Sequence, residues 1–270
     1  MRIIEPHIHT VSRTTDDYHN MSASGIVACV EPSFWAGIDK RAVASFEDYW
    51  EQMISHETRR ALEYGIRHYV MIGLNPKEAR SPIARHVIGA MEGYLERERV
   101  VGVGEIGLDL ITKEEEEAFR LQLRMAEERS MPVVVHSPHH DKKKGIERII
   151  AIIKEEGVNE ERIVIDHNTE ETIELALSTN CWAGMTVYYV TKLTAGRAVD
   201  MLVRYGTRKM IVNGSADWGY SDPLAVPKVC ELMRKSGLFP ESDIEKIAFR
   251  NPYEFFSHSP RFDLEGHGGT

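Results

Sequence analysis

The sequence has few cysteines and no long apolar stretch. Its three cysteines, Cys29, Cys181 and Cys230, lie far apart without a Cys-x-x-Cys pair, so we expect small buried core residues instead of disulfides or a thiolate zinc site. No apolar run approaches the roughly 18 residues of a membrane-spanning helix. The first ten residues include a glutamate and two histidines, unlike a signal peptide. We therefore expect a cytoplasmic protein with no membrane partner.

The chain also lacks an excess of basic residues. Its 270 residues include 33 lysines and arginines against 42 aspartates and glutamates, which gives a formal net charge of −9. A protein that holds nucleic acid through a broad surface needs clustered Lys and Arg. We therefore expect a small-molecule substrate in preference to nucleic acid. With 42% apolar and 28% charged residues, the composition is typical of a soluble globular protein.

Short runs rich in Val and Ile alternate with segments of helical periodicity. Apolar residues recur at spacings of three and four between the runs, as in 46–64, 114–130 and 198–206, which is typical of amphipathic helices. Nearly continuous apolar strands predict a parallel sheet with both faces covered, and eight such units in about 250 residues predict an α/β fold of the TIM (β/α)8 barrel type. The predicted strands are 2–8, 25–30, 67–72, 99–105, 132–136, 162–166, 181–187 and 208–213.

We expect a single domain. No repeat, low-complexity tract or linker interrupts residues 1–256, which we assign to the barrel. Residues 257–270 are polar and rich in glycine, and we expect a loosely attached C-terminal tail there. The long stretches 10–24 and 31–45 follow the first two predicted strands, where the loops of this fold build the face that carries the site.

Residues with metal-binding side chains lie at the carboxyl ends of five predicted strands. His7 and His9 are two positions apart, so both side chains point the same way from the first strand. The carboxyl ends of barrel strands surround one mouth, so the other residues meet these two there. The full set is His7, His9, Glu105, His136, His167 and Asp217. Such a cluster in a low-dielectric cavity is costly unless a metal or hydrogen bonds compensate it, and we expect a metal.

The ligand types and their number indicate two metal ions. Histidine and carboxylate without thiolate suit zinc, manganese, iron or nickel, and we take zinc as the first candidate. Six ligands are too many for one catalytic zinc with an open position, but they suit two divalent ions about 3.5 to 4 Å apart that share a carboxylate. We therefore expect a binuclear site. Polar residues that satisfy one another by hydrogen bonds without a metal are the alternative.

Motifs along most of the chain match a known family. They are His7-Ile8-His9, the run Gly-Glu-Ile-Gly-Leu-Asp at 104–109, the run Pro-Val-Val-Val-His at 132–136, His167, Asp217, and Asn251-Pro252 with Phe255-Phe256. Together they resemble the TatD-like branch of the metal-dependent amidohydrolase superfamily, from residue 1 to about 256. The resemblance implies that His7, His9 and Asp217 hold one metal, that His136 and His167 hold the other, and that Glu105 bridges both.

The positions that would meet substrate depart from the family pattern. The family's Gly-x-His-Pro is Gly-Leu-Asn-Pro at 73–76, its Asp-Ser/Thr-Pro is Asp-Trp-Gly at 217–219, and its His-x-Arg is His-Ser-Pro at 136–138. Leu110 and Ile111 replace the aromatic residue and arginine that usually follow Gly-Leu-Asp. Some TatD relatives are DNases, and these departures together with the acidic charge argue against that activity here.

These observations predict a binuclear metal-dependent hydrolase. A metal-activated hydroxide would attack an ester, amide, lactone or phosphoester bond, and Asp217 would carry the proton to the leaving group. No Gly-x-Ser-x-Gly motif indicates a serine hydrolase. Two alternatives are a TatD-type DNase that acts on nucleic acid ends and a metal-stabilised barrel that binds without catalysis.

Loop residues on the face of the site are the candidates for substrate binding. They are Arg13, Trp35, His139 and Trp218. Arg13 and the segment 139–144 could supply local positive charge for an anionic substrate, although we interpret the lysines at 142–144 as a solvated surface. The two tryptophans could form an apolar wall of the pocket.

Overall fold

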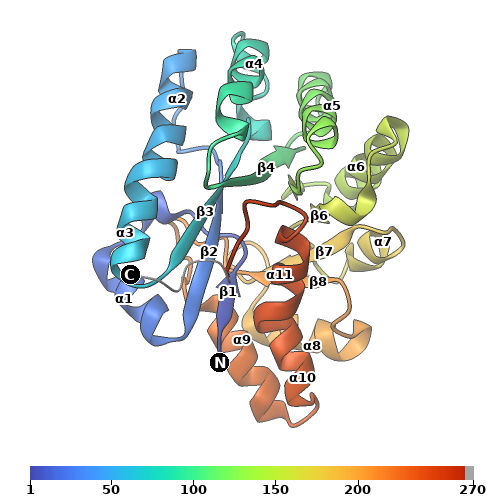
Figure 1. Ribbon diagram of the computed structural model, residues 1–270. Helices are drawn as coiled ribbons and strands as arrows, with labels where there is room; N and C mark the ends of the chain where they lie inside the picture. Colours follow the sequence, from blue (N-terminus) through green and yellow to red (C-terminus); the bar gives the residue numbers. More distant parts are fainter. Residues whose placement is uncertain (265–270) are drawn as a thin grey trace.

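The computed structural model describes residues 1–264 and contains a single sheet of eight strands (Figure 1). Neighbours in the sheet follow chain order, and each of the seven successive pairs is parallel. The strands are β1 (Ile3–Glu5), β2 (Ile26–Pro32), β3 (Arg67–Ile72), β4 (Val100–Gly107), β5 (Val133–His136), β6 (Ile163–Ile165), β7 (Trp182–Thr186) and β8 (Met210–Asn213). Each of the eight predicted strands overlaps one of these strands, but β1 is shorter than predicted and ends at Glu5 instead of at residue 8.

The first and last strands meet just beyond their carboxyl ends. Ile8 and Ala216 form an isolated parallel bridge, and the His9 amide donates to the Ala216 carbonyl at 3.0 Å. The sheet is therefore a nearly closed barrel, which confirms the predicted single-domain TIM barrel. The bridge also places the segment after β1 beside the segment after β8, and both segments carry predicted site residues.

Helices surround the barrel (Figure 1). The α-helices are α1 (Thr15–Ala23), α2 (Val43–Glu51), α3 (Thr58–Glu63), α4 (Ala84–Leu95), α5 (Lys113–Glu128), α6 (Lys142–Glu156), α7 (Ile173–Leu177), α8 (Ala195–Tyr205), α9 (Ala225–Ser236), α10 (Glu241–Glu245) and α11 (Asn251–Phe256). Shorter 3₁₀ turns are η1 (Thr10–Ser12), η3 (Pro76–Glu78) and η4 (Glu160–Arg162), and π-helical turns are η2 (Gln52–Glu57) and η5 (Lys246–Arg250).

The apolar interior has two parts. The larger one lies between the strands and the helices, where the periodic faces of the helices are buried. The smaller one contains barrel residues such as Ile4, Met71 and Val134 together with Phe255 and Phe256 of α11. Helix α11 thus joins the apolar cluster of the barrel strands, and the carboxyl ends of the strands are left for the polar site.

Part of the expected tail belongs to this smaller cluster. Phe262 and Leu264 are only 5% and 7% exposed and join the cluster with Tyr69 and Phe256. The Tyr69 hydroxyl also donates to the Asp263 carbonyl at 2.6 Å. The prediction of a loose attachment is therefore wrong for residues 257–264, because two apolar side chains fix this otherwise polar segment. The rest of the predicted tail, 265–270, lies outside the described residues.

Two smaller predictions concern cysteine and membranes. Cys29, Cys181 and Cys230 are all buried and unbridged, as expected for small core residues. Among residues 1–264, no helix combines the length and apolarity that crossing a membrane requires. The cytoplasmic location stays a prediction.

Candidate metal centre

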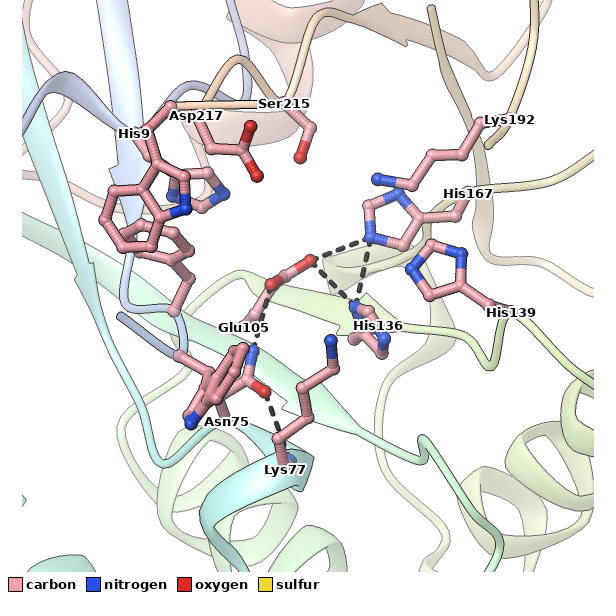
Figure 2. Close-up of a pocket in the computed structure, with 13 residues that line it drawn as sticks. His9, Asn75, Lys77, Glu105, His136, His139, His167, Lys192, Ser215 and Asp217 are labelled. Atoms are coloured by element: carbon pink, nitrogen blue, oxygen red, sulfur yellow. Dashed lines mark hydrogen bonds and ion pairs between the residues drawn. The ribbon is translucent and has the colours of Figure 1, made fainter. Parts of the chain in front are cut away.

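Five of the six predicted ligands converge in one buried cluster at the carboxyl ends of the strands, and Figure 2 shows His9, Glu105, His136 and His167 of this cluster. Glu105 lies in β4 and His136 is the last residue of β5, whereas His7, His9 and His167 follow β1 and β6 instead of lying on them. All five side chains are buried. Residues from distant parts of the sequence thus meet at one mouth, as the barrel topology requires.

The cluster consists of two groups that share Glu105. His7, His9 and Glu105 form one group, and Glu105, His136 and His167 form the other, with the possible ligand atoms of each group within 4.8 Å of one another. Glu105 Oε1 lies 2.8 Å from His167 Nε2, 3.2 Å from His136 Nδ1 and 3.7 Å from His7 Nε2. One carboxylate oxygen therefore reaches both groups, which is the geometry of a bridging ligand.

The donor set fits divalent cations. The ring nitrogens of His7 and His9 face each other at 3.3 Å, and those of His136 and His167 at 3.1 Å. His9 Nδ1 and His136 Nε2 are buried without a hydrogen-bond partner among the described residues. Converging nitrogen lone pairs repel one another unless a proton or a cation lies between them. Each group therefore has the nitrogen and oxygen donors that suit one divalent ion.

The charges at the cluster also favour a cation. Burial lowers the pKa of His9 and of His167 well below the usual range, so both rings are neutral, the form that binds a metal. Burial by itself raises the pKa of Glu105, but the nearby His136 and His7 outweigh it and the net shift is downward. Glu105 is therefore an ionised carboxylate among imidazoles.

Asp166, which the sequence analysis missed, orients a histidine in each group. It directly follows β6 and is completely buried. Its Oδ2 accepts a hydrogen bond from His7 Nδ1 at 2.7 Å, which leaves His7 Nε2 to face the site. Its Oδ1 accepts from the His167 amide at 2.7 Å and from the Thr186 hydroxyl at 3.2 Å. Asn213 Nδ2 donates to both oxygens at 3.0 Å.

Thr186 extends this network to the His167 ring. Its hydroxyl lies 2.7 Å from His167 Nδ1 and donates to Asp166, so it accepts the Nδ1 proton of His167. His167 Nε2 is then unprotonated where it faces Glu105. The carboxylate of Asp166 thus sets the tautomers of His7 and His167, a role that outer carboxylates commonly have around metal-binding histidines.

Two residues at the strand ends have left-handed backbone conformations. His167 has a φ of 63° and Ser215 has a φ of 42°, each of which costs on the order of 1–3 kcal/mol for a residue other than glycine. The Ser215 amide donates to the His7 carbonyl at 2.7 Å, which ties the segment after β8 to the segment after β1. The fold sustains this local strain at the positions that bring side chains into the site.

Asp217 lies in the same cavity but outside both groups. Its Oδ1 accepts hydrogen bonds from the Tyr188 hydroxyl at 3.0 Å and from the Gly219 amide at 2.7 Å. Burial, with the charge of Asp217, raises the pKa of Tyr188 to about 12, so Tyr188 remains a donor at neutral pH. A Cβ at position 219 would lie 2.0 Å from the Tyr188 hydroxyl, so a larger residue there would have to displace this hydroxyl.

Three of the four candidate substrate residues line the cavity, and the fourth does not. Trp35, His139 and Trp218 line a cavity of about 150 Å³ that also borders Glu105. Arg13 does not line it: its Nη1 lies 3.8 Å from Asp17 Oδ2, and its Nε donates to Ser12 Oγ at 3.3 Å. The ring of Trp218 packs 5.1 Å from that of Phe34, so aromatic side chains form one side of the pocket.

Several polar residues of the site were not identified from the sequence. Asn75, which stands where the family has histidine, donates to Glu105 Oε2 at 3.1 Å. Lys77 and Lys192 also line the cavity. Lys142, interpreted above as solvated, is buried and donates to the His167 carbonyl at 3.0 Å. That interpretation is wrong for Lys142, because the residue lies on the buried side of α6 beside His167, whereas the lysines at 143 and 144 are exposed.

Comparisons with known proteins identify chains that are similar to this one over nearly its whole length. Residues 7–257 match the family model described as TatD related DNase. The chain is 26% identical over 257 residues to an uncharacterized metal-dependent hydrolase of Methanocaldococcus jannaschii, which covers 94% of this chain and 99% of that protein. The crystal structure of the TatD-like protein of Archaeoglobus fulgidus matches with a TM-score of 0.80 and 25% identity, over 94% of this chain and 99% of that one.

Two more distant structures share the fold. The phosphotriesterase homology protein of Escherichia coli, complexed with phosphate in its active site, has a TM-score of 0.70 and 15% identity over 94% of this chain and 98% of that one. A lactonase of Listeria monocytogenes has a TM-score of 0.66 and 16% identity over 94% of each chain. The match to the family model spans nearly the whole chain, so the predicted resemblance is confirmed. This protein therefore belongs to the TatD related DNase family and is a hydrolase.

Proposed function

We propose that the protein is a binuclear metal-dependent hydrolase of a small ester, amide, lactone or phosphoester substrate. The observation that carries the proposal is Glu105, whose Oε1 lies near His136 and His167 of one group and near His7 of the other. A carboxylate shared by two donor groups is what two neighbouring divalent ions need. We propose zinc as the metal, with manganese, iron and nickel as alternatives that the same ligands accept.

Each ligand side chain would have a defined role at the two metal ions. His7 and His9 would hold one ion and His136 and His167 the other, with Glu105 as a ligand to both and Asp217 completing the first set. Bound divalent ions lower the pKa of water from about 15.7 toward 7 and polarise the bond that is cleaved. Asp166 keeps the imidazoles of His7 and His167 in the tautomers that point a bare nitrogen inward.

Asp217 is the proposed proton acceptor. Tyr188 and Gly219 donate hydrogen bonds to its Oδ1, whereas its Oδ2 has no hydrogen-bond partner within residues 1–264, and the residue lines the cavity. A carboxylate fixed by one oxygen and free at the other can take a proton from the attacking water and deliver it to the leaving group. The family assignment favours this enzymatic role over a barrel that only binds.

Similar proteins suggest which bonds to test. The relative from Methanocaldococcus jannaschii is named a metal-dependent hydrolase, and two proteins of the same fold are named a phosphotriesterase homology protein and a lactonase. The test is a panel of chromogenic phosphomonoester, phosphodiester, carboxylic ester and lactone substrates on zinc-loaded protein, with Glu105→Gln as the matched control. We expect turnover that chelator abolishes and zinc restores. The proposal would be contradicted if the zinc-loaded wild type turned over no substrate of the panel faster than Glu105→Gln does.

A nuclease is the second candidate, because the matching family model is described as a DNase. The net charge of −9 and the substituted positions around the pocket argue against it. We expect end-labelled duplex DNA to bind weakly and to be degraded more slowly than the best small substrate. Tight DNA binding at physiological ionic strength, with a steep dependence on salt concentration, would instead favour the nuclease over the hydrolase of small substrates.

A further inference from the structure

Two lysines reach into the cavity beside the proposed metal centre. Lys77 belongs to η3, after β3, and its amide donates to Asn75 Oδ1 at 3.1 Å. Lys192 belongs to the turn between β7 and α8, where its amide donates to the Tyr188 carbonyl at 2.8 Å. Both residues line the cavity, and their ammonium groups point toward its interior from two different sides (Figure 2). The backbone of each lysine is thus anchored while its charge faces the place where substrate binds.

Neither ammonium group has a hydrogen-bond or ion-pair partner within residues 1–264. Lys77 Nζ lies 5.2 Å from the centre of the Trp35 ring, and Lys192 Nζ lies 5.3 Å from that of Tyr188. An aromatic face attracts a cation but carries no countercharge. The nearby Lys40 differs, because its Nζ is paired with Glu78 at 2.9 Å. Lys77 and Lys192 are therefore charges without a neutralising partner in the part of the chain that is described.

Lys192 is partly removed from water, so its ammonium charge is destabilised when no anion pairs with it. Removal from water lowers the pKa of Lys192, and the nearby Lys77 lowers it further, although Glu105, Asp166 and Asp217 counteract part of the shift. An ammonium group that is partly removed from water is stabilised when an anion pairs with it. A ligand with negative charge between the two lysines would provide that pairing and would relieve their mutual repulsion.

We propose that Lys77 and Lys192 form an anion subsite that holds a terminal phosphoryl group of the substrate. The proposal rests on the proposed hydrolase function and narrows its substrate class to phosphomonoesters. A lysine ammonium is a compact point charge with three donors that commonly binds phosphate, whereas the planar fork of an arginine fits carboxylate and phosphate alike. Two lysines and no arginine line the cavity within residues 1–264. Ammonium groups from two sides can reach different oxygens of a tetrahedral dianion.

The test is calorimetric titration of the zinc-loaded protein with inorganic phosphate, dimethyl phosphate and acetate. The variants are Lys77→Met and Lys192→Met, and Lys143→Met on the exposed side of α6 is the matched control. Hydrogen bonds to charged groups contribute enough that we expect the phosphate dissociation constant to rise about tenfold or more in each cavity variant. The control should bind phosphate as the wild type does, and the other two anions should bind more weakly than phosphate.

Two outcomes would overturn the subsite. One is phosphate binding by both cavity variants within twofold of the wild type. The other is dimethyl phosphate or acetate binding to the wild type as tightly as phosphate. Zinc content and thermal melting, measured on the same samples, separate this test from that of the hydrolase: a protein that takes up no zinc contradicts the proposed function, and the lysine dependence of phosphate binding by that metal-free protein still decides the subsite.

Discussion

Replacing Asp166 with asparagine tests whether one carboxylate orients both histidine groups. All the groups that contact Asp166 side-chain oxygens are donors: His7 Nδ1, the His167 amide, Thr186 Oγ1 and Asn213 Nδ2. An asparagine must turn its own NH2 toward at least one of these donors. The Asp166→Asn variant therefore loses the negative charge and also creates a donor facing a donor in a fully buried position.

The expected loss follows from these contacts. A hydrogen bond to a charged group contributes about 1.5–3 kcal/mol, and loss of an outer carboxylate typically lowers metal affinity about 10- to 100-fold. His7 and His167 belong to different groups, so we expect both zinc affinities to fall by a factor in this range. Misorientation of only one histidine would instead lower chiefly one of the two zinc affinities.

The assay is competition for zinc between the protein and a chromophoric chelator, which yields two binding constants. Asp200→Asn, on the exposed side of α8, is the matched control and should leave both constants unchanged. Circular dichroism verifies that the variant is folded. Asp166→Asn with both constants within twofold of the wild type would refute the reasoning that Asp166 orients the two groups.

Three further predictions concern the proton acceptor and a buried lysine. Asp217→Asn should keep the fold and most of the metal while kcat falls by about 10²- to 10⁴-fold with a smaller change in KM; kcat within about threefold of wild type at full metal occupancy would make Asp217 only a ligand. Tyr188→Phe removes one of the two donors to Asp217 and should lower kcat by about tenfold or less, and an unchanged kcat would exclude a positioning role. Burial lowers the pKa of Lys142 from its ordinary 10.5 to about 8, so between these pH values the folded state binds fewer protons than the unfolded state and stability rises with pH. Lys142→Met should remove up to about 3 kcal/mol of that rise, measured as the change in urea unfolding free energy between pH 7 and pH 10; an equal pH dependence in variant and wild type would contradict it.

The fold could be predicted from the sequence because its signals, the apolar strand runs and the helical periodicity between them, are local and recur along the chain. Each strand is a short apolar run that ends near a polar residue, and the order of strands and helices leaves few topologies. The His-x-His pair and the later histidines converge because each lies at or just beyond the carboxyl end of a strand of one barrel. The ligand cluster could therefore be predicted without knowledge of any contact.

The remaining parts of the site depend on contacts that no local pattern encodes. Asp166 directly follows an apolar strand and precedes His167, a position that was a usable signal, but its hydrogen bonds to His7 and Asn213 exist only in the closed barrel. Lys77 and Lys192 lie in loops, so the conformation of each loop decides whether the charge faces solvent or the cavity. Charge runs and polar tails are usually exposed, and Lys142 and Phe262 are buried because neighbouring elements cover them.

Metal content measured per chain tests the central claim of a binuclear site most directly. Protein reconstituted with zinc and freed of excess should contain close to two ions per chain by elemental analysis. Glu105→Gln should lower the occupancy of both ions because it weakens the shared ligand, and His167→Ala should mainly empty one. A value near zero in the reconstituted wild type, or equal and negligible effects of the two substitutions, would contradict the account.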